Sequence, residues 1–440
     1  MQLGEKISVK VATAVGLGAI IGAGIFVLSG TAIALAGSAA LISFVIVGVI
    51  ALIVALELGE LGSIMPFAQG GSYSYAYEAF GSELGFVTGI MLYFSYATSI
   101  APISLGFGSY FVSLTGLPAS VYPYLFAILL ILILTVVNIL GVSKAAKADF
   151  GLVVIKIGIL VAFIAFALLF AVESGFDVTS HFSSGFQAGN LGAILASSVV
   201  IFFAYSGFQA ISTITQNVKG GGSGAAKAIL ASVLISIVLY VMVVVALLFL
   251  MPSEQYGISS NPLSFALQTA EAPTWIFTLV SVGALIATTS AALAMLLASS
   301  RVLHQIGSDK LLPKLVRKYN EKREVPVNGV LISAAIGIIM LFSGDIYVMA
   351  AISNFGLLFC YLVASFSLIH FRRHKSVSSF RVPLYPLLPT VGIGGLLVLL
   401  IGMPREALII GVAMILVLIF VYYSLVEAES RKVEKIEIFD

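Results

Sequence analysis

Glycines crowd one apolar stretch of the chain, "LGAIIGAGIF", which contains Gly18, Gly22 and Gly24. Glycine weakens a helix by roughly 1 kcal/mol relative to alanine, so a helix can open here. An opening from Ile20 to Gly24 frees backbone N–H groups. These groups and the positive end of the following half-helix together suit a carboxylate. The carbonyl oxygens freed at the other half-helix suit an ammonium group.

A second interruption is expected in "FFAYSGFQA", where Ser206 and Gly207 stand near the middle of another apolar run. Two interrupted helices in corresponding positions of two repeats meet near the middle of a membrane bundle. Amide and carbonyl ends brought together in this way match a zwitterion. Taken alone, Gly18 and Gly22 also fit a GxxxG pair that only allows close helix packing. The second interruption favours a binding site.

Lys156 is an isolated charge in the apolar stretch "LVVIKIGIL". It lies twelve residues into the run 144–172, roughly 18 Å from its start at 1.5 Å per residue. This depth is too great for easy snorkelling, so the side chain is expected to face protein. Removal from water disfavours an ammonium group, which makes Lys156 a candidate proton carrier. The alternative is a permanently charged tether that pairs with the opened carbonyl groups.

The elements that position these residues follow from composition. The 440 residues are 60% hydrophobic and 10% charged, and the mean hydropathy is +1.13. Such a chain is an integral membrane protein, and continuous apolar runs of about 20 residues predict spanning helices rather than barrel strands. We expect an all-α protein with twelve transmembrane helices near 11–36, 39–66, 84–114, 121–140, 144–172, 190–217, 225–250, 274–303, 327–343, 345–371, 386–403 and 405–425.

Positive charge predicts the orientation. An even number of spans places both termini on one side, and every Lys and Arg except Arg405 and Lys156 falls on that side or in its connections. We therefore expect cytoplasmic termini in a multi-pass protein of the cell membrane. The net charge of +2 reflects topology and does not indicate nucleic-acid binding.

The two interrupted helices predict an internal repeat. Because five is odd, a second set of five helices returns with inverted orientation, which relates helix 1 to helix 6. The expected division is 1–172 for the first repeat, 190–371 for the second, 383–425 for two peripheral helices and 426–440 for a cytoplasmic tail.

Several motifs carry a family resemblance. They are "GAGIFVLSG", "ELGSIMPFAQGGSYSYAY", "NILGVSKAAKADF", "FFAYSGF", Ser300-Arg301 followed by "DKLLP", and "FRVPLYPLLP". In this order they resemble the amino acid–polyamine–organocation transporter superfamily, in particular its cationic amino acid transporter branch. The resemblance implies a five-plus-five inverted repeat of the leucine-transporter type, with helices 1 and 6 interrupted and two helices added at the C-terminus.

The resemblance also implies residue roles. In relatives the carboxylate of an amino acid is held by amides that match Gly22, Ala23 and Gly24, and its ammonium meets carbonyl groups that match Ile20, Phe203 and Ser206. Aromatic rings at the second interruption commonly occlude the substrate, which makes Phe202 and Phe203 candidates. Ile21 and Gly207 complete the candidate site within the two openings.

Further roles concern charge. In sodium-coupled relatives a cation lies between helices 1, 5 and 8, and the ammonium of Lys156 is expected to replace it. Its candidate partners are Gly18, Thr288, Thr289 and Ser290. Glu60 matches a family position six residues before a proline and is expected to be a structural charge that binds loop amides. The cationic branch usually carries an acid where Gln209 stands, which disfavours a strongly cationic substrate.

These observations predict a secondary active transporter that moves an amino acid by alternating access in symport with protons. An exchanger with a structural Lys156 is the alternative. A channel is disfavoured because polar side chains do not recur along the helices. An enzyme is disfavoured because no nucleophile, base and metal constellation stands out. The expected partners are an amino acid, a proton and the lipid bilayer, with no cofactor, no metal and no nucleic acid.

Overall fold

The computed structural model describes residues 6–65, 71–118, 120, 122–141, 149–173, 182, 191–212, 215–309, 311–321, 323, 325–374 and 376–426. Within these ranges the chain is helical and forms no β-strand, with isolated bridges between Ile7 and Val218 and between Asn320 and Val325. The all-helical expectation is confirmed. The expected tail beyond residue 426 lies outside the described residues.

The first half of the chain begins where the Ser8 side chain accepts a hydrogen bond from the Val11 N–H and starts the first helix. Gly116, in the left-handed conformation, ends the long helix that contains Pro102. The helices are α1 (Val9–Ile20), α2 (Ala23–Ala36), α3 (Ala40–Ile64), α4 (Ser72–Phe80), α5 (Ser82–Thr115), α6 (Tyr122–Ile139) and α7 (Asp149–Glu173).

The second half of the chain contains another divided helix, and short helices lie between some of its long helices. Asp345 caps one of its helices by accepting a hydrogen bond from the Val348 N–H at 3.0 Å. The helices are α9 (Leu191–Tyr205), α10 (Gln209–Ser212), α11 (Gly221–Leu250), α12 (Pro262–Thr269), α13 (Thr274–Ser308), α14 (Lys314–Arg317), α15 (Val327–Met340), α16 (Ile346–Arg373), α17 (Leu387–Ile401) and α18 (Arg405–Val421).

Many of these helices are apolar enough to cross a membrane. Among the described residues, eight segments have the necessary length and composition, and α1, α9, α15 and α17 are shorter apolar helices. Two of the shorter helices, α1 and α9, end at the interruptions that the glycines indicated. Together these elements describe a multi-pass membrane protein.

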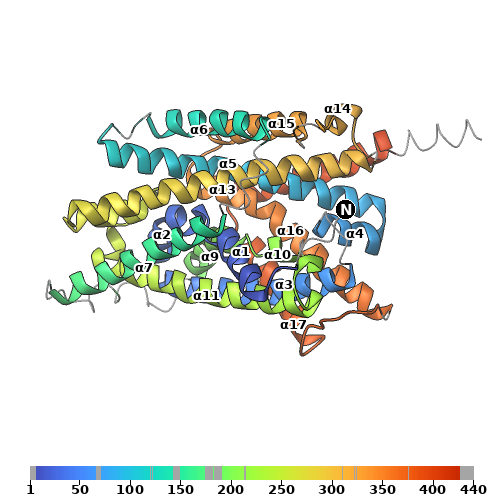
Figure 1. The fold of residues 1–440 in the computed structure, drawn as a ribbon, viewed down its shortest axis with the longest axis horizontal. Coiled ribbons are helices and arrows are strands. Elements are labelled where there is room, and N and C mark those ends of the chain that lie inside the picture. The colour runs from blue at the N-terminus through green and yellow to red at the C-terminus, as the bar shows by residue number, and fades with distance from the viewer. Residues whose placement is uncertain are drawn as a thin grey trace, which may run out of the picture.

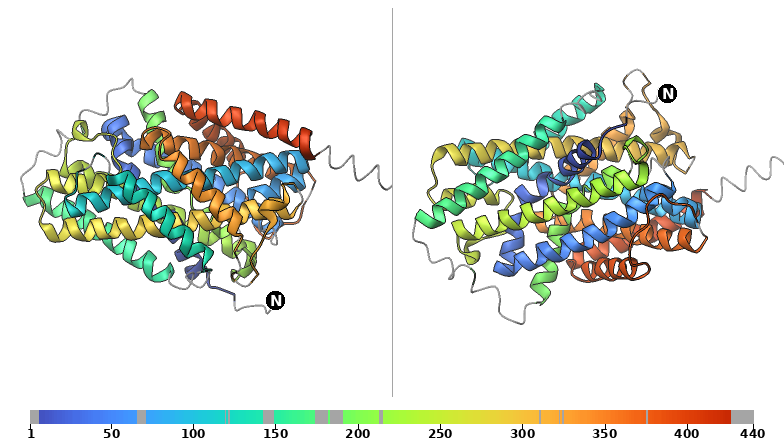
Figure 2. Two further views of the ribbon diagram at one scale, coloured as in Figure 1. Left: turned by 90° about the horizontal axis from the view of Figure 1, so that it is seen from above. Right: turned by 60° about the horizontal axis from the view of Figure 1, so that its bottom comes forward.

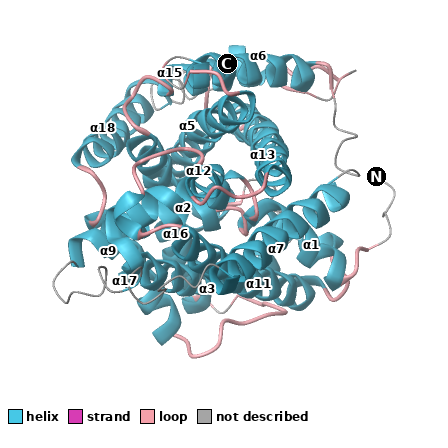
Figure 3. Ribbon diagram, turned by 90° about the vertical axis from the view of Figure 1, so that its left-hand side faces the viewer, coloured by secondary structure: helices cyan, strands magenta, loops and turns pink. Residues whose placement is uncertain are grey.

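The long helices lie along one common direction (Figures 1 and 2). Seen end-on, α2 and α16 lie inside the bundle, while α6, α15, α17 and α18 lie toward its rim (Figure 3). Helices α4 and α14 lie at the same end of the bundle (Figure 1). The ends of the two divided helices are buried, since Ile20 is 2% and Tyr205 0% exposed.

Candidate functional site

The first break separates α1 from α2. Helix α1 ends at Ile20 and α2 begins at Ala23. Between them Ile21 (φ −76°, ψ 68°) forms an inverse γ-turn, in which the Gly22 N–H donates to the Ile20 carbonyl oxygen at 2.7 Å. Gly22 occupies the N-cap position and no side chain caps α2. The first-turn N–H groups of α2 thus form an end suited to an anion.

The second break separates α9 from α10. Helix α9 ends at Tyr205 and α10 begins at Gln209. The Ser206 hydroxyl turns back and donates to the Phe203 carbonyl oxygen at 2.8 Å. Gly207 lies within the turn that follows. The interruption falls on the Ser-Gly pair that the sequence indicated.

Two glycines bring the breaks into contact. A Cβ atom at Gly207 would lie 2.0 Å from the carbonyl oxygen of Ala19 in α1. A Cβ atom at Gly24 would lie 2.4 Å from the Cα atom of Ala204 in α9. Both neighbours are backbone atoms, so no rotamer change relieves these clashes. The broken helices touch because neither position carries a side chain.

Gly18 and Gly22 have different surroundings. A Cβ atom at Gly18 would lie 2.4 Å from Cγ2 of Val153 in α7, whereas the nearest atom to a Cβ at Gly22 is 3.5 Å away on Ala291. Close packing therefore explains Gly18. Gly22 has room for a methyl group, and its place at the start of α2 associates it with the opening.

Tyr240 of α11 joins the two breaks. Its buried hydroxyl donates to the Ile20 carbonyl oxygen at 2.8 Å and lies 3.2 Å from the carbonyl oxygen of Ala204. The Ile20 carbonyl, which the resemblance assigns to a substrate ammonium, thus already accepts hydrogen bonds from Tyr240 and Gly22. Sequence reasoning missed Tyr240 because a single tyrosine in an apolar run gives no spacing signal.

A cavity of about 450 Å³ lies beside the breaks. Its walls come from α1, α2, α3, α4, α5, α7, α13, α16 and residues at the second break. Small-molecule sites occupy roughly 300–1,000 Å³, so the volume fits such a ligand. The predicted residues that line the cavity are Gly18, Ile20, Gly22, Ala23, Gly24, Lys156, Phe203, Ser206, Gly207 and Ser290.

Other predicted residues are absent from the described lining, namely Ile21, Phe202, Thr288 and Thr289. The fully buried Phe202 ring packs edge-on against Tyr361 of α16, with 5.9 Å between the ring centroids. The Thr288 hydroxyl donates to a carbonyl oxygen of its own helix at 2.7 Å. The structure thus places Phe203, rather than Phe202, at the cavity wall.

Lys156 projects from α7 and is 2% exposed. It lines the cavity together with Gly18 of α1 and Ser290 of α13. Helix α7 packs on α1, α11 and α13. The last carbonyl groups of α1 carry partial negative charge, so the end of this helix is suited to a neighbouring cation.

Polar side chains from α5, α16 and the second break complete the lining. They include Ser95, Tyr96 and Ser99 on α5, Asn354 on α16 and Gln209. The Gln209 amide contacts the Tyr96 hydroxyl, and Asn354 Nδ2 donates to a carbonyl oxygen of α9 at 2.6 Å. Ser95, Tyr96, Ser99 and Asn354 were missed, whereas Gln209 had been noted only as standing where the cationic branch carries an acid. Ser95 and Ser99 share a helix face at i, i+4 spacing, the one signal that would have indicated them.

The charged residues that line the cavity are both cations. Lys156 and Arg301 line it, and the lining residues that the structure describes include no carboxylate. Arg301 is exposed near the end of α13, and Gly71 and Ser72, at the start of α4, also belong to the lining. The cavity therefore extends from the breaks toward the end of the bundle that carries α4 (Figure 1).

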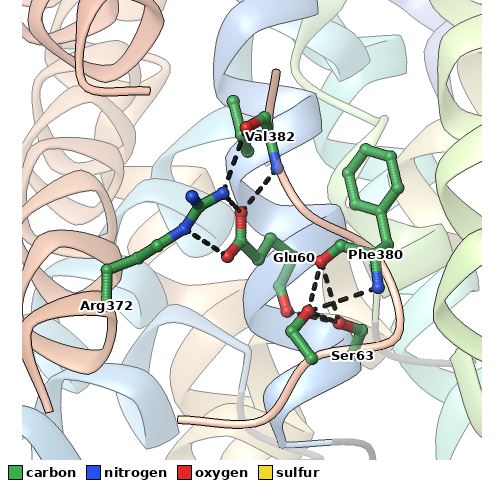
Figure 4. A network of polar contacts seen from close by, with 6 residues as sticks. Glu60, Ser63, Arg372, Phe380 and Val382 are labelled. Carbon is green, nitrogen blue, oxygen red and sulfur yellow. Dashed lines mark hydrogen bonds and ion pairs between the residues drawn. The ribbon is translucent and has the colours of Figure 1, made fainter. Parts of the chain in front are cut away.

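Glu60 lies outside this cavity in a saturated polar network (Figure 4). Arg372 of α16 donates Nε to Oε1 and Nη2 to Oε2, both at 2.6 Å, and the Val382 N–H donates to Oε2 at 2.6 Å. Arg372 also lies over the Tyr385 ring, 4.5 Å from its centroid. The carboxylate thus joins α3, α16 and the following loop.

Comparison with known proteins decides the family. The model of the family described as "Amino acid permease" matches residues 11–429. The chain belongs to the amino acid permease family. The resemblance to the wider amino acid–polyamine–organocation superfamily is thereby confirmed. Three of the motifs that carried it include residues outside the described ranges, namely 66–70, 142–148 and 310.

The relatives of this chain are named for different substrates. The chain is 31% identical over 416 residues to a methylthioribose transporter of Bacillus subtilis, covering 89% of the chain and 87% of that protein. It is 26% identical to the branched-chain amino acid permease BcaP of the same organism, covering 95% and 92%. It is 28% identical to the chloroplastic cationic amino acid transporter 7 of Arabidopsis thaliana, covering 82% and 64%.

A solved structure supports the fold of this family member. A manganese transporter mutant of Eremococcus coleocola superposes with a TM-score of 0.63 at 16% identity, covering 96% of both chains. At this identity the likeness concerns the fold alone. Family membership places the chain among membrane transporters of small molecules.

Proposed function

We propose that the chain is a secondary active transporter that carries a neutral amino acid across the cell membrane by alternating access. The observation that carries this proposal is the uncapped N-terminal end of α2, which lines a cavity where two broken helices touch. The amide end of α2 matches a carboxylate and the carbonyl end of α1 matches an ammonium. Main-chain groups thus meet both charges of an amino acid.

The substrate class follows from the walls of the cavity. The described lining offers two cations and no carboxylate to a substrate side chain, and it includes the apolar residues Ile103, Met295 and Leu357. A cationic side chain would meet like charge there and find no counter-ion. A neutral, mainly apolar side chain fits, as the similarity to branched-chain amino acid permeases also suggests.

Within the site, we assign the carboxylate to the amides of Gly22, Ala23 and Gly24. We assign the ammonium to the side of the second break, at the carbonyl of Ser206, because the Ile20 carbonyl already accepts two hydrogen bonds. Phe203 is the ring placed to cover the substrate, since it lines the cavity.

The scaffold we propose has twelve membrane crossings in two inverted repeats of five, followed by α17 and α18. Its support is a contact pattern that maps onto itself: α1 packs on α7 as α9 packs on α16, and α5 packs on α6 as α13 packs on α15. The paired elements α3 and α11, and α5 and α13, also pack against each other. Two repeats related by an axis in the membrane plane produce this pattern. The distribution of positive charge supports cytoplasmic termini.

We assign the coupled proton to Lys156. As an ammonium it stabilises the carbonyl end of α1 beside the cavity, and as a neutral amine it loses that attraction. Protonation is thereby connected to the position of α1, which is what symport requires. An exchanger in which Lys156 stays charged is the competing mechanism.

Uptake into proteoliposomes tests the proposal. Labelled leucine, alanine, lysine and methylthioribose are supplied while the pH gradient, sodium and internal substrate are varied independently. We expect accumulation of a neutral amino acid driven by an inward proton gradient. Lys156→Ala abolishes that accumulation, whereas Lys227→Ala, which changes an exposed lysine of α11, keeps it.

Three outcomes contradict parts of the proposal. Accumulation of methylthioribose without any amino acid overturns the substrate class. Accumulation by Lys156→Ala under the proton gradient overturns the role of this lysine. Strict dependence on internal substrate replaces symport with exchange.

A further inference from the structure

Glu57 is a buried carboxyl group that the proposed transport mechanism does not use. It is 0% exposed in α3, one turn before Glu60. Its side chain meets Ser365 of α16 and approaches Gly392 of α17. The next residue, Leu58, lines the substrate cavity, and Glu57 is absent from that lining. The carboxyl group therefore lies behind the cavity wall, between α3 and two C-terminal helices.

The hydrogen bonds around Ser365 require one more proton than an ionised Glu57 supplies. The Ser365 hydroxyl is in contact with Oε2 of Glu57 and lies 3.0 Å from the carbonyl oxygen of Tyr361. A hydroxyl has a single hydrogen, so it donates fully to one of these oxygens. If Oε2 carries a proton, it donates to Ser365, and Ser365 donates to Tyr361. Both contacts are then complete hydrogen bonds.

The other oxygen of Glu57 also favours the neutral acid. Among the described residues Oε1 has no hydrogen-bond partner. A Cβ atom at Gly392 would lie 2.9 Å from it, so the backbone of α17 covers this oxygen closely. The same Cβ atom would lie 2.9 Å from Cγ2 of Ile53, so an apolar side chain also borders this glycine. A charged oxygen in such surroundings is costly, whereas a neutral carbonyl oxygen is tolerated far better.

Within the described part of the chain, no ion pair compensates an ionised Glu57. On α3 the neighbouring Glu60 is itself a carboxylate, and on α16 Arg372 gives two hydrogen bonds to Glu60. The segment Leu387–Ile401 of α17 contains no ionisable side chain. Helices α11 and α9 also pack on α3. Helix α11 carries Lys227, which is exposed. Helix α9 carries Tyr205, whose hydroxyl donates to the Phe44 carbonyl oxygen, more than three helical turns from Glu57 along α3.

We propose that Glu57 is a proton-binding site of this transporter, occupied in the present conformation, and that release of its proton is coupled to a loosening of α16 against α3. Release leaves a carboxylate with one hydroxyl donor and one unpaired oxygen, which only water or a shifted helix can satisfy. Helix α16 also carries Tyr361, whose hydroxyl lies 3.5 Å from the Ser206 carbonyl oxygen at the second break. The acid is thereby connected to the site without entering its cavity, and the inference does not rest on Lys156.

Infrared spectroscopy of the purified protein in lipid tests the first half of this proposal. A protonated carboxylic acid has a C=O stretching band that a carboxylate lacks. Exposed carboxyl groups, with pKa values of about 4, are ionised at neutral pH. We expect the band to persist there, to vanish in Glu57→Gln and to remain in Glu78→Gln, a control at an exposed carboxyl. Absence of the band, or its persistence in Glu57→Gln, overturns the proposal.

The second half is tested by Cys360, the one cysteine of the chain. It is fully buried on α16, where its thiol contacts the Thr88 carbonyl oxygen. The rate of maleimide labelling of Cys360 is measured across pH in the wild type and in Glu57→Gln. Dividing the wild-type rate by the variant rate cancels the effect of the thiol's own ionisation. We expect this ratio to rise with pH. A constant ratio refutes the coupling, and neither measurement requires a known substrate, so failure here is distinct from failure of the transport proposal.

Discussion

Gly207→Ala measures how much the contact between the two breaks contributes to substrate affinity and to protein stability. The added Cβ would lie 2.0 Å from the carbonyl oxygen of Ala19 and 2.2 Å from its carbon, far inside the 3.4–4 Å of ordinary contact. Both atoms belong to the backbone of α1, so the breaks must separate. Overpacking of this kind costs about 1–3 kcal/mol. If that strain falls on the substrate-bound state, it corresponds to a roughly 5- to 150-fold loss of apparent affinity.

The assay compares Gly207→Ala with Gly192→Ala in α9. A Cβ at Gly192 meets nothing within 4 Å, so this control adds the same methyl group without a clash. Initial rates of uptake give the Michaelis constant, and thermal unfolding in lipid gives the stability. We expect a raised Michaelis constant for Gly207→Ala and wild-type behaviour for Gly192→Ala. If both variants match the wild type in affinity and stability, the contact between the breaks does not position the site.

Three further changes probe the surroundings of the site. Tyr240→Phe removes one hydrogen-bond donor from the buried carbonyl oxygens of Ile20 and Ala204 and is expected to lower the free energy of unfolding by about 1–3 kcal/mol, whereas Tyr122→Phe at an exposed position is neutral by thermal unfolding. Arg372→Met leaves Glu60 buried without its cation, at a cost of about 3–5 kcal/mol, and adding Glu60→Gln restores part of the melting temperature. Gln209→Glu adds a carboxylate to the cavity, so competition assays are expected to show inhibition by lysine; unchanged selectivity would contradict the charge argument.

The sequence predicted the membrane class and the positions of both interruptions. Continuous apolar runs are a local property, because each spanning segment must satisfy its own backbone groups in lipid. The weak points of a helix are also local, since Gly22 and the Ser206-Gly207 pair lower helix stability wherever the chain folds. These features are readable without any knowledge of neighbours.

Glycine roles were only partly predictable. The pair Gly18 and Gly22 fitted both packing and opening, and the structure divides these functions: Gly18 faces Val153 at close range, while Gly22 begins α2. Which role a glycine has depends on the atoms opposite it. Those atoms come from helices far away in the chain, so spacing alone does not identify them.

Side-chain partners were the least predictable part of the site. Phe202 and Phe203 are adjacent in the chain, yet only Phe203 lines the cavity, because successive helical residues point about 100° apart. Tyr240 gave no signal in the sequence and nevertheless contacts both breaks.

The sequence by itself determined that this chain lies in a membrane as helices, that two of them are interrupted, and that few charges lie within them. Only the tertiary structure decided that the interruptions touch and that, among the described residues, Arg372 forms its ion pair with Glu60 and not with Glu57. The reason is physical: apolarity and helix weakness are properties of a segment, whereas the state of a buried charge depends on which groups from other segments fill its hydrogen bonds.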